Sequence, residues 1–315
     1  MASRASSTQT HMTRLVLLGA AMLALLAHGR VIAQDFSTAV DAVTLSVRVT
    51  RADAYVGGLP ESAFAVLEDG EPQAITFFAS QDTPATVGVI VDSSISVHAM
   101  RDTLVEGAGA LAQSANPGDE FFGIAFNEDT WPVLPVRQPF TSDANVLRDA
   151  LNTGIRPRGR TGLYDAIAAG LRYAARGSLS RRVLVVVSDG GDNASDATLA
   201  EIIAATRASN VVLYAVALID PIDDEARPEV LKQLAQQSGG ESFAAHNAAE
   251  IRAAIERIAR DIRHTYTLGY VPARPADGAF HHVRVTVTPP DRRRVVVSTR
   301  DGYVRHPIEA RPDVP

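Results

Sequence analysis

The segment TVGVIVDSSISVHAM, from Thr86 to Met100, decides how the rest of the chain is interpreted. It begins with an apolar run over residues 87–91 that is rich in β-branched side chains. This length and composition predict a buried parallel strand. The run stops at Asp92, and a helical pattern follows Ser96. Because ligands bind at the carboxyl ends of strands in open α/β sheets, the loop after this strand is a candidate site.

Asp92, Ser94 and Ser96 alternate along that loop, so a tight turn can direct their three side-chain oxygens toward one point. A carboxylate and two hydroxyl groups are hard ligands that suit Mg²⁺ or Mn²⁺ better than zinc or copper. Helix capping is the alternative, because Ser and Asp also favour the N-cap position of helices. The loop therefore predicts a hard-metal site.

Strand and helix patterns alternate over residues 86–264, the central part of the chain. The expected strands lie at 87–91, 121–126, 131–136, 183–187, 211–219 and near Phe243, and the expected helices at 97–115, 143–152, 162–175, 197–208, 228–237 and 248–263. Such alternation predicts an α/β fold with a doubly wound, mostly parallel sheet and helices on both faces.

Two β-rich segments, residues 35–80 and 265–306, flank this central part. Apolar residues alternate with polar ones over 43–49 and again over 283–287, which is typical of half-buried antiparallel strands. Neither segment has enough strands to form a core alone. We expect the two segments to pack together as one small β-sandwich-like domain, with the α/β domain inserted between them.

Two further loops carry oxygen ligands at the predicted strand and helix ends. Thr161 stands just before a helix in RTGLYDA, and Asp189 ends the second uninterrupted apolar strand in VVVSDGG. The topology predicts that these loops share one sheet edge with Asp92. The pair His281-His282 does not predict a shared metal site, because adjacent residues of a strand face opposite sides.

The pieces DSSIS, TGLYDA and VVVSDGG, in this order and spacing, resemble the von Willebrand factor A-type domain and its metal-ion-dependent adhesion site. The flanking LEDG and DGY sequences resemble a bacterial exported subfamily of such proteins. The resemblance implies that hydroxyl groups of Ser94, Ser96 and Thr161 bind the metal, while Asp92 and Asp189 bind it directly or through water. It also implies an open coordination position that accepts an Asp or Glu carboxylate of a protein partner.

Residues 1–33 have the form of a secretory signal peptide. Arg4 and Arg14 precede an apolar core at 15–27, and small residues follow at the expected cleavage site. The core is short for a membrane span, although an uncleaved anchor is the alternative and the one route to membrane attachment. The sequence thus predicts an exported protein, located in the periplasm, at the cell surface or outside the cell.

Composition excludes several functions. The chain has no cysteine, which removes disulfide and thiolate chemistry, and a net charge of −6, which argues against nucleic-acid binding. Our leading interpretation is a non-enzymatic adhesion-type module that needs Mg²⁺ or Mn²⁺. A metal-dependent hydrolase is the second interpretation, although the chain lacks a G-x-S-x-G nucleophile elbow. A scaffold of an envelope complex, with a purely structural metal, is the third.

Overall fold

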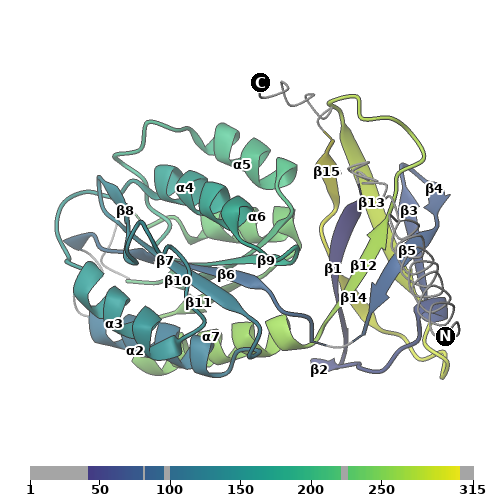
Figure 1. The fold of residues 1–315 in the computed structure, drawn as a ribbon, viewed down its shortest axis with the longest axis horizontal. Helices are drawn as coiled ribbons and strands as arrows, with labels where there is room; N and C mark the ends of the chain where they lie inside the picture. The colour runs from purple at the N-terminus through teal and green to yellow at the C-terminus, as the bar shows by residue number, and fades with distance from the viewer. Residues whose placement is uncertain (1–41, 81, 96–99, 221–225, 306–315) are drawn as a thin grey trace, which may run out of the picture. The chain divides into compact units, whose positions relative to one another are not determined.

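The structure is a computed structural model that describes residues 42–80, 82–95, 100–220 and 226–305 (Figure 1). The predicted signal peptide and Ser96 lie outside the described residues. No helix within these four ranges is long and apolar enough to cross a membrane.

A six-stranded sheet forms the centre of the α/β part. Its strands are β6 (Thr86–Asp92), β7 (Glu120–Phe126), β8 (Thr130–Pro132), β9 (Arg182–Ser188), β10 (Val211–Leu218) and β11 (Ser242–Ala245), in the order β11-β10-β9-β6-β7-β8. All neighbours are parallel except β8, which is antiparallel to β7. Strand β8 is shorter than the predicted 131–136, which contains Pro132 and Pro135, residues without a backbone N–H for a ladder.

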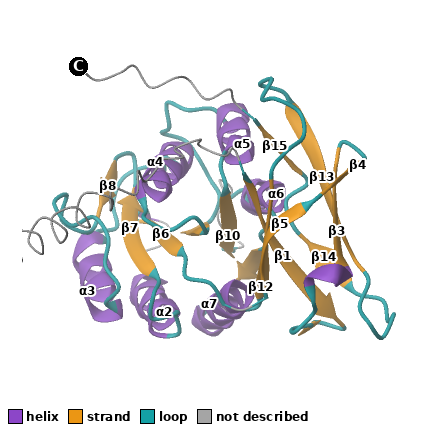
Figure 2. Cartoon of the chain, turned by 45° about the vertical axis from the view of Figure 1, so that its right-hand side comes forward, coloured by secondary structure: helices purple, strands orange, loops and turns teal. Residues whose placement is uncertain are grey.

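Helices cover both faces of this sheet (Figure 2). One apolar cluster packs the sheet against α2 (Arg101–Gln113), α3 (Ala144–Gly154) and α7 (Ala248–Arg263). A second cluster packs the other face against α4 (Leu163–Arg176), α5 (Leu199–Ala208) and α6 (Pro228–Ser238). The doubly wound α/β fold predicted from the alternating patterns is confirmed.

Strands from both flanking segments form two further sheets around a shared core (Figure 1). One sheet has the order β14-β1-β12-β5, with β2 beside β1, and the other has the order β15-β13-β3-β4. The strands are β1 (Val43–Arg51), β2 (Ala54–Tyr55), β3 (Phe64–Glu68), β4 (Glu71–Gln73), β5 (Ile75–Ala79), β12 (Thr265–Tyr270), β13 (Phe280–Val287), β14 (Val296–Ser298) and β15 (Gly302–Val304). The assignment of these strands to a separate domain stays a prediction.

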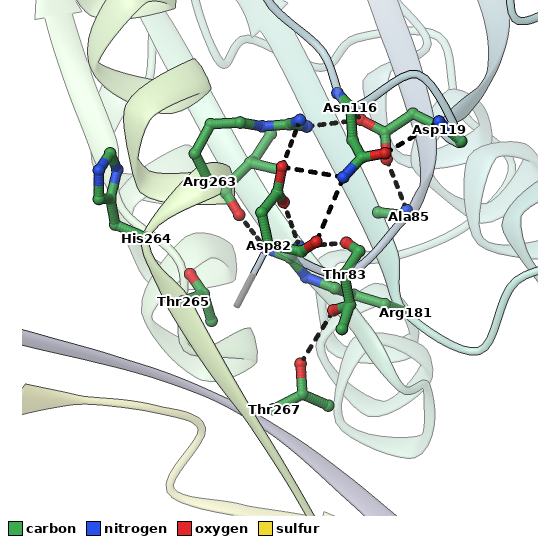
Figure 3. Close-up of polar contacts among 12 residues, drawn as sticks. Asp82, Thr83, Ala85, Asn116, Asp119, Arg181, Arg263, His264, Thr265 and Thr267 are labelled. Carbon is green, nitrogen blue, oxygen red and sulfur yellow. Dashed lines mark hydrogen bonds and ion pairs between the residues drawn. The ribbon is translucent and has the colours of Figure 1, made fainter. Parts of the chain in front are cut away.

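The chain passes between the sandwich strands and the α/β part twice, after β5 and after α7. An ion-pair cluster lies at these crossings (Figure 3). The guanidinium of Arg263, at the end of α7, contacts Asp82 at 2.7 Å and Asp119 at 2.5 Å. Asn116 also donates to Asp82 at 3.1 Å. These contacts fix the end of α7 to the segments that lead into β6 and β7.

A second anchor of α7 is the fully buried carboxylate of Asp261. It accepts hydrogen bonds from Arg48 of β1 and from the hydroxyl of Tyr55 in β2, and Arg257 lies 3.2 Å away. Arg48 is itself 9% exposed and also pairs with Glu241 at 2.7 Å. A buried carboxylate of this kind requires such partners, since an unpaired one is strongly destabilising.

Candidate metal centre

The carboxyl ends of β6 and β9 meet at one edge of the central sheet. The register aligns Val91 with Val187 across β6 and β9, and Asp92 with Phe126 across β6 and β7. The chain continues from β6 to β7 on one side, whereas β9 lies on the other side. Strand order therefore reverses at β6, and such a reversal is where open α/β sheets bind ligands.

Asp92 is fully buried at this edge. Its Oδ1 accepts a hydrogen bond from the backbone N–H of Ser94 at 2.8 Å, and its Oδ2 accepts one from the Ser188 hydroxyl at 2.8 Å. Burial raises the pKa of Asp92 to about 6; the nearby Asp189 carboxylate adds to the rise, and hydrogen bonds from Ser94 and Ser188 oppose it. The two aspartates of neighbouring strands thus repel each other in a buried setting.

Thr161 lies between the loops that follow β7 and β9. Its backbone N–H donates to the Asn193 side chain at 3.0 Å, and its carbonyl accepts from the Asn193 N–H at 2.9 Å. The next residue, Gly162, donates to the carbonyl of Asn127 at 2.7 Å. Because β7 and β9 flank β6, these contacts bring the buried Thr161 to the same edge as Asp92.

Asp189 begins the loop after β9. Its Oδ1 accepts a hydrogen bond from Gly191 at 2.8 Å, and its backbone carbonyl accepts one from Arg227, just before α6. Gly190 between them has a φ of +85°, and a Cβ there would lie 2.3 Å from the carbonyl oxygen of Arg227. Only glycine fits this left-handed, crowded position, so Gly190 sets the direction of the Asp189 loop.

The residues at this edge fit a hard divalent cation. Asp92, Ser94, Thr161 and Asp189 are all buried and offer only oxygen atoms. A cation between Asp92 and Asp189 would reduce the repulsion between their carboxylates. Because Ser96 lies outside the described residues, the five-residue ligand set stays a prediction.

Sequence reasoning missed two serines that shape this site. Ser188 donates to Asp92, and Ser93 accepts the backbone N–H of Arg156 on its hydroxyl at 2.8 Å, which fixes the first loop to the segment after α3. The one sequence feature that could have pointed to Ser188 is its position at the end of a predicted strand.

Asp165, one turn past Thr161, accepts hydrogen bonds from the backbone N–H groups of Asp196 and Ala197, at 2.9 and 3.1 Å. It fixes the loop after β9.

The three loops at the switch point of this sheet are those of a von Willebrand factor A-type domain. The chain belongs to the von Willebrand factor type A domain family, whose sequence profile matches residues 87–257. Domains of this family hold a divalent metal ion at a metal-ion-dependent adhesion site.

Solved structures with a similar fold come from distant proteins. A von Willebrand factor type A protein from Catenulispora acidiphila is 13% identical with a TM-score of 0.51, and the match covers 85% of this chain and 75% of that one. Proximal thread matrix protein 1 from the mussel byssus is 11% identical with a TM-score of 0.51, covering 62% of this chain and 51% of that one. No curated protein matches the sequence. At such identities the similarity concerns the fold alone.

Proposed function

We propose that this protein is an exported, adhesion-type interaction module that binds an Asp or Glu side chain of a protein partner through a metal ion. The ion is Mg²⁺ or Mn²⁺, and its ligands are Asp92, Ser94, Ser96, Thr161 and Asp189. The observation that carries the proposal is the buried Asp92 carboxylate beside Asp189 at the switch point of the sheet.

The chain's own residues position this ligand set. Ser188 and the Ser94 N–H hold both oxygens of Asp92, and Asn193 holds the backbone of Thr161. When bound, the ion supplies an electrophilic coordination position that accepts a carboxylate oxygen, because few charged ligands surround it. The basic start and short apolar core of residues 1–33 support export.

The first test is calorimetric titration of the protein with Mg²⁺ and Mn²⁺. We expect saturable binding in the wild type and none in Asp92→Ala, because the variant loses a central oxygen ligand. Asp196→Ala is the matched control, since Asp196 is an exposed acid on the loop after β9 whose backbone, not its side chain, contacts Asp165. Equal binding by wild type and Asp92→Ala would overturn the proposal.

A second measurement distinguishes a metal ion that binds a partner's carboxylate from a metal ion that is purely structural. In the Mn²⁺-loaded protein, water-proton relaxation reports the waters on the ion. The tripeptide Gly-Glu-Gly, with an acetylated N-terminus and an amidated C-terminus, should reduce this relaxation by replacing one of the waters. Gly-Gln-Gly with the same blocked ends should not. Metal binding without any effect of Gly-Glu-Gly would favour a purely structural metal. Turnover of a generic ester or phosphate substrate that is lost in Asp92→Ala would favour a hydrolase instead.

A further inference from the structure

A second cluster of side chains that could hold a metal ion lies in the β-sandwich. It belongs to the sheet in which β13 pairs with β3 and β15, and Figure 1 shows these strands. It consists of Glu68 at the end of β3, Asp69 in the turn to β4, and His281 on β13. One ligand atom from each residue lies within 4.8 Å of the others. His281 Nδ1 is 2.8 Å from Asp69 Oδ2 and 3.9 Å from Glu68 Oε1.

Glu68 is a buried carboxylate with one oxygen directed at this cluster. Its Oε2 accepts hydrogen bonds from the hydroxyls of Tyr270 at 2.6 Å and Tyr303 at 2.9 Å. The other oxygen, Oε1, faces His281 Nδ1 at 3.9 Å, and Glu68 is only 4% exposed. A cation beside His281 would bind this oxygen and reduce the cost of burying the carboxylate.

His281 is oriented as metal-binding histidines are. It is 4% exposed, and while Nδ1 faces Glu68 and Asp69, Nε2 faces Asp277 Oδ1 at 3.0 Å. Asp277 is held in turn by the backbone N–H of Ala279 at 2.8 Å. A carboxylate on one ring nitrogen fixes the tautomer and makes the other nitrogen a better ligand.

The charges of the cluster also favour a cation. Three carboxylates, from Glu68, Asp69 and Asp277, surround one imidazole, so even an imidazolium leaves negative charge in excess. Arg274 is a further positive charge that acts on Asp69, at the exposed side of the cluster. In the metal-free protein, a proton on Nδ1 donates to Asp69, and a metal ion would take the place of that proton.

We propose that Glu68, Asp69 and His281 bind a divalent transition-metal ion, with Zn²⁺ the best match, at a site separate from the loops of the central sheet. Zn²⁺ accepts imidazole nitrogen and carboxylate oxygen in tetrahedral sites, and water completes the fourth position. The imidazole ligand disfavours Mg²⁺, which prefers oxygen. The ion would clamp the β3–β4 turn to β13.

The test uses the full chain carrying Asp92→Ala, so that the loop site does not contribute. We expect one equivalent of Zn²⁺ by calorimetry, and a visible absorption band when Co²⁺ replaces it. Adding His281→Ala should abolish both signals. Adding His282→Ala should change neither, because His282 is the next residue of the same strand and is exposed.

Asp277→Asn tests the orienting carboxylate and should weaken Zn²⁺ binding roughly 10- to 100-fold. Asp69→Asn keeps the shape of the side chain but removes its charge. We expect this variant to lose Zn²⁺ binding while its circular dichroism spectrum stays unchanged, which would show that a ligand was lost and that the protein did not unfold. The proposal is overturned if the Asp92→Ala protein binds no Zn²⁺, or if His281→Ala and His282→Ala bind it equally. These outcomes are independent of Mg²⁺ binding at the loop site.

Discussion

At the scale of single residues, the loop after β9 depends on a position that only glycine can occupy. Gly190 has a φ of +85° and lies against the backbone of Arg227. A side chain at position 190 would collide with that backbone, so the path of the loop that carries Asp189 requires glycine there. Gly278 has a similar φ of +76° but lies in open space. Comparing substitutions at the two glycines therefore distinguishes the free-energy cost of a left-handed backbone, which both share, from the cost of a steric clash, which only Gly190 has.

We therefore expect Gly190→Ala to destabilise the protein more than Gly278→Ala. A left-handed alanine costs about 1–2 kcal/mol, and the clash with Arg227 should add about 1 kcal/mol or more. Urea unfolding measures the difference. Mg²⁺ affinity should fall in Gly190→Ala alone, because the clash displaces Asp189. Equal losses of stability in the two variants would show that the loop moves aside without cost.

At the scale of secondary-structure elements, α7 is held at two places by charged side chains. Asp261 binds Arg48 and Tyr55 of the sandwich, and Arg263 binds Asp82 and Asp119 at the crossings. The helix continues directly into β12, which pairs with both β1 and β5. The position of α7 is thus set by strands of the flanking sheets as well as by its own apolar face.

Asp261→Ala should lower the free energy of unfolding by about 3–5 kcal/mol, because it leaves the buried guanidinium of Arg48 with only the half-exposed Glu241 as partner. Glu256→Ala is the matched control on the same helix. Glu256 is exposed and lies 3.8 Å from Arg260, and such pairs contribute about 0–1 kcal/mol. Denaturant unfolding compares the two, and similar small losses would mean that Asp261 does not anchor the helix.

At the scale of the whole molecule, the proposed metal ion would stabilise the folded state. A ligand that binds only the folded state raises stability by about 2.7 kcal/mol at one hundred times its dissociation constant. We expect chelation to lower the melting temperature of the wild type. Asp92→Ala should show no response to added Mg²⁺. A wild-type melting temperature that is the same with and without Mg²⁺ would contradict this linkage.

Much of the fold could be predicted because its signals are local. The uninterrupted apolar runs of β6 and β9 mark buried parallel strands, and the polar residues directly after them mark the candidate site. Ser188 was missed because its role depends on the register between two strands, and a side chain at a strand end has many uses. The ligand assignment itself stays a prediction.

The cluster of Glu68, Asp69 and His281 depends on contacts between residues far apart in the sequence, which local sequence patterns do not reveal. The sequence correctly places His281 and His282 on opposite sides of a strand, since one is buried and the other exposed. It gives no sign of Asp69, which precedes His281 by 212 residues. The same holds for Arg48 and Asp261, 213 residues apart. Such pairs arise because strands β1, β3 and β5 pair with β12 and β13, which lie about 200 residues further along the chain.

The two crossings also determine how the protein would respond to tension. They meet where Thr83, just before β6, lies 3.3 Å from Thr267 of β12, hydroxyl to hydroxyl (Figure 3). Asp92 ends β6, which is seven residues long, at the opposite end of the strand. A pull between a partner held at Asp92 and an anchored sandwich would run lengthwise along β6. This strand is hydrogen-bonded to β7 on one side and β9 on the other. Such a force would load the backbone hydrogen bonds between β6 and both neighbouring strands at the same time, in shear, whereas a force across the sheet would break these bonds one after another.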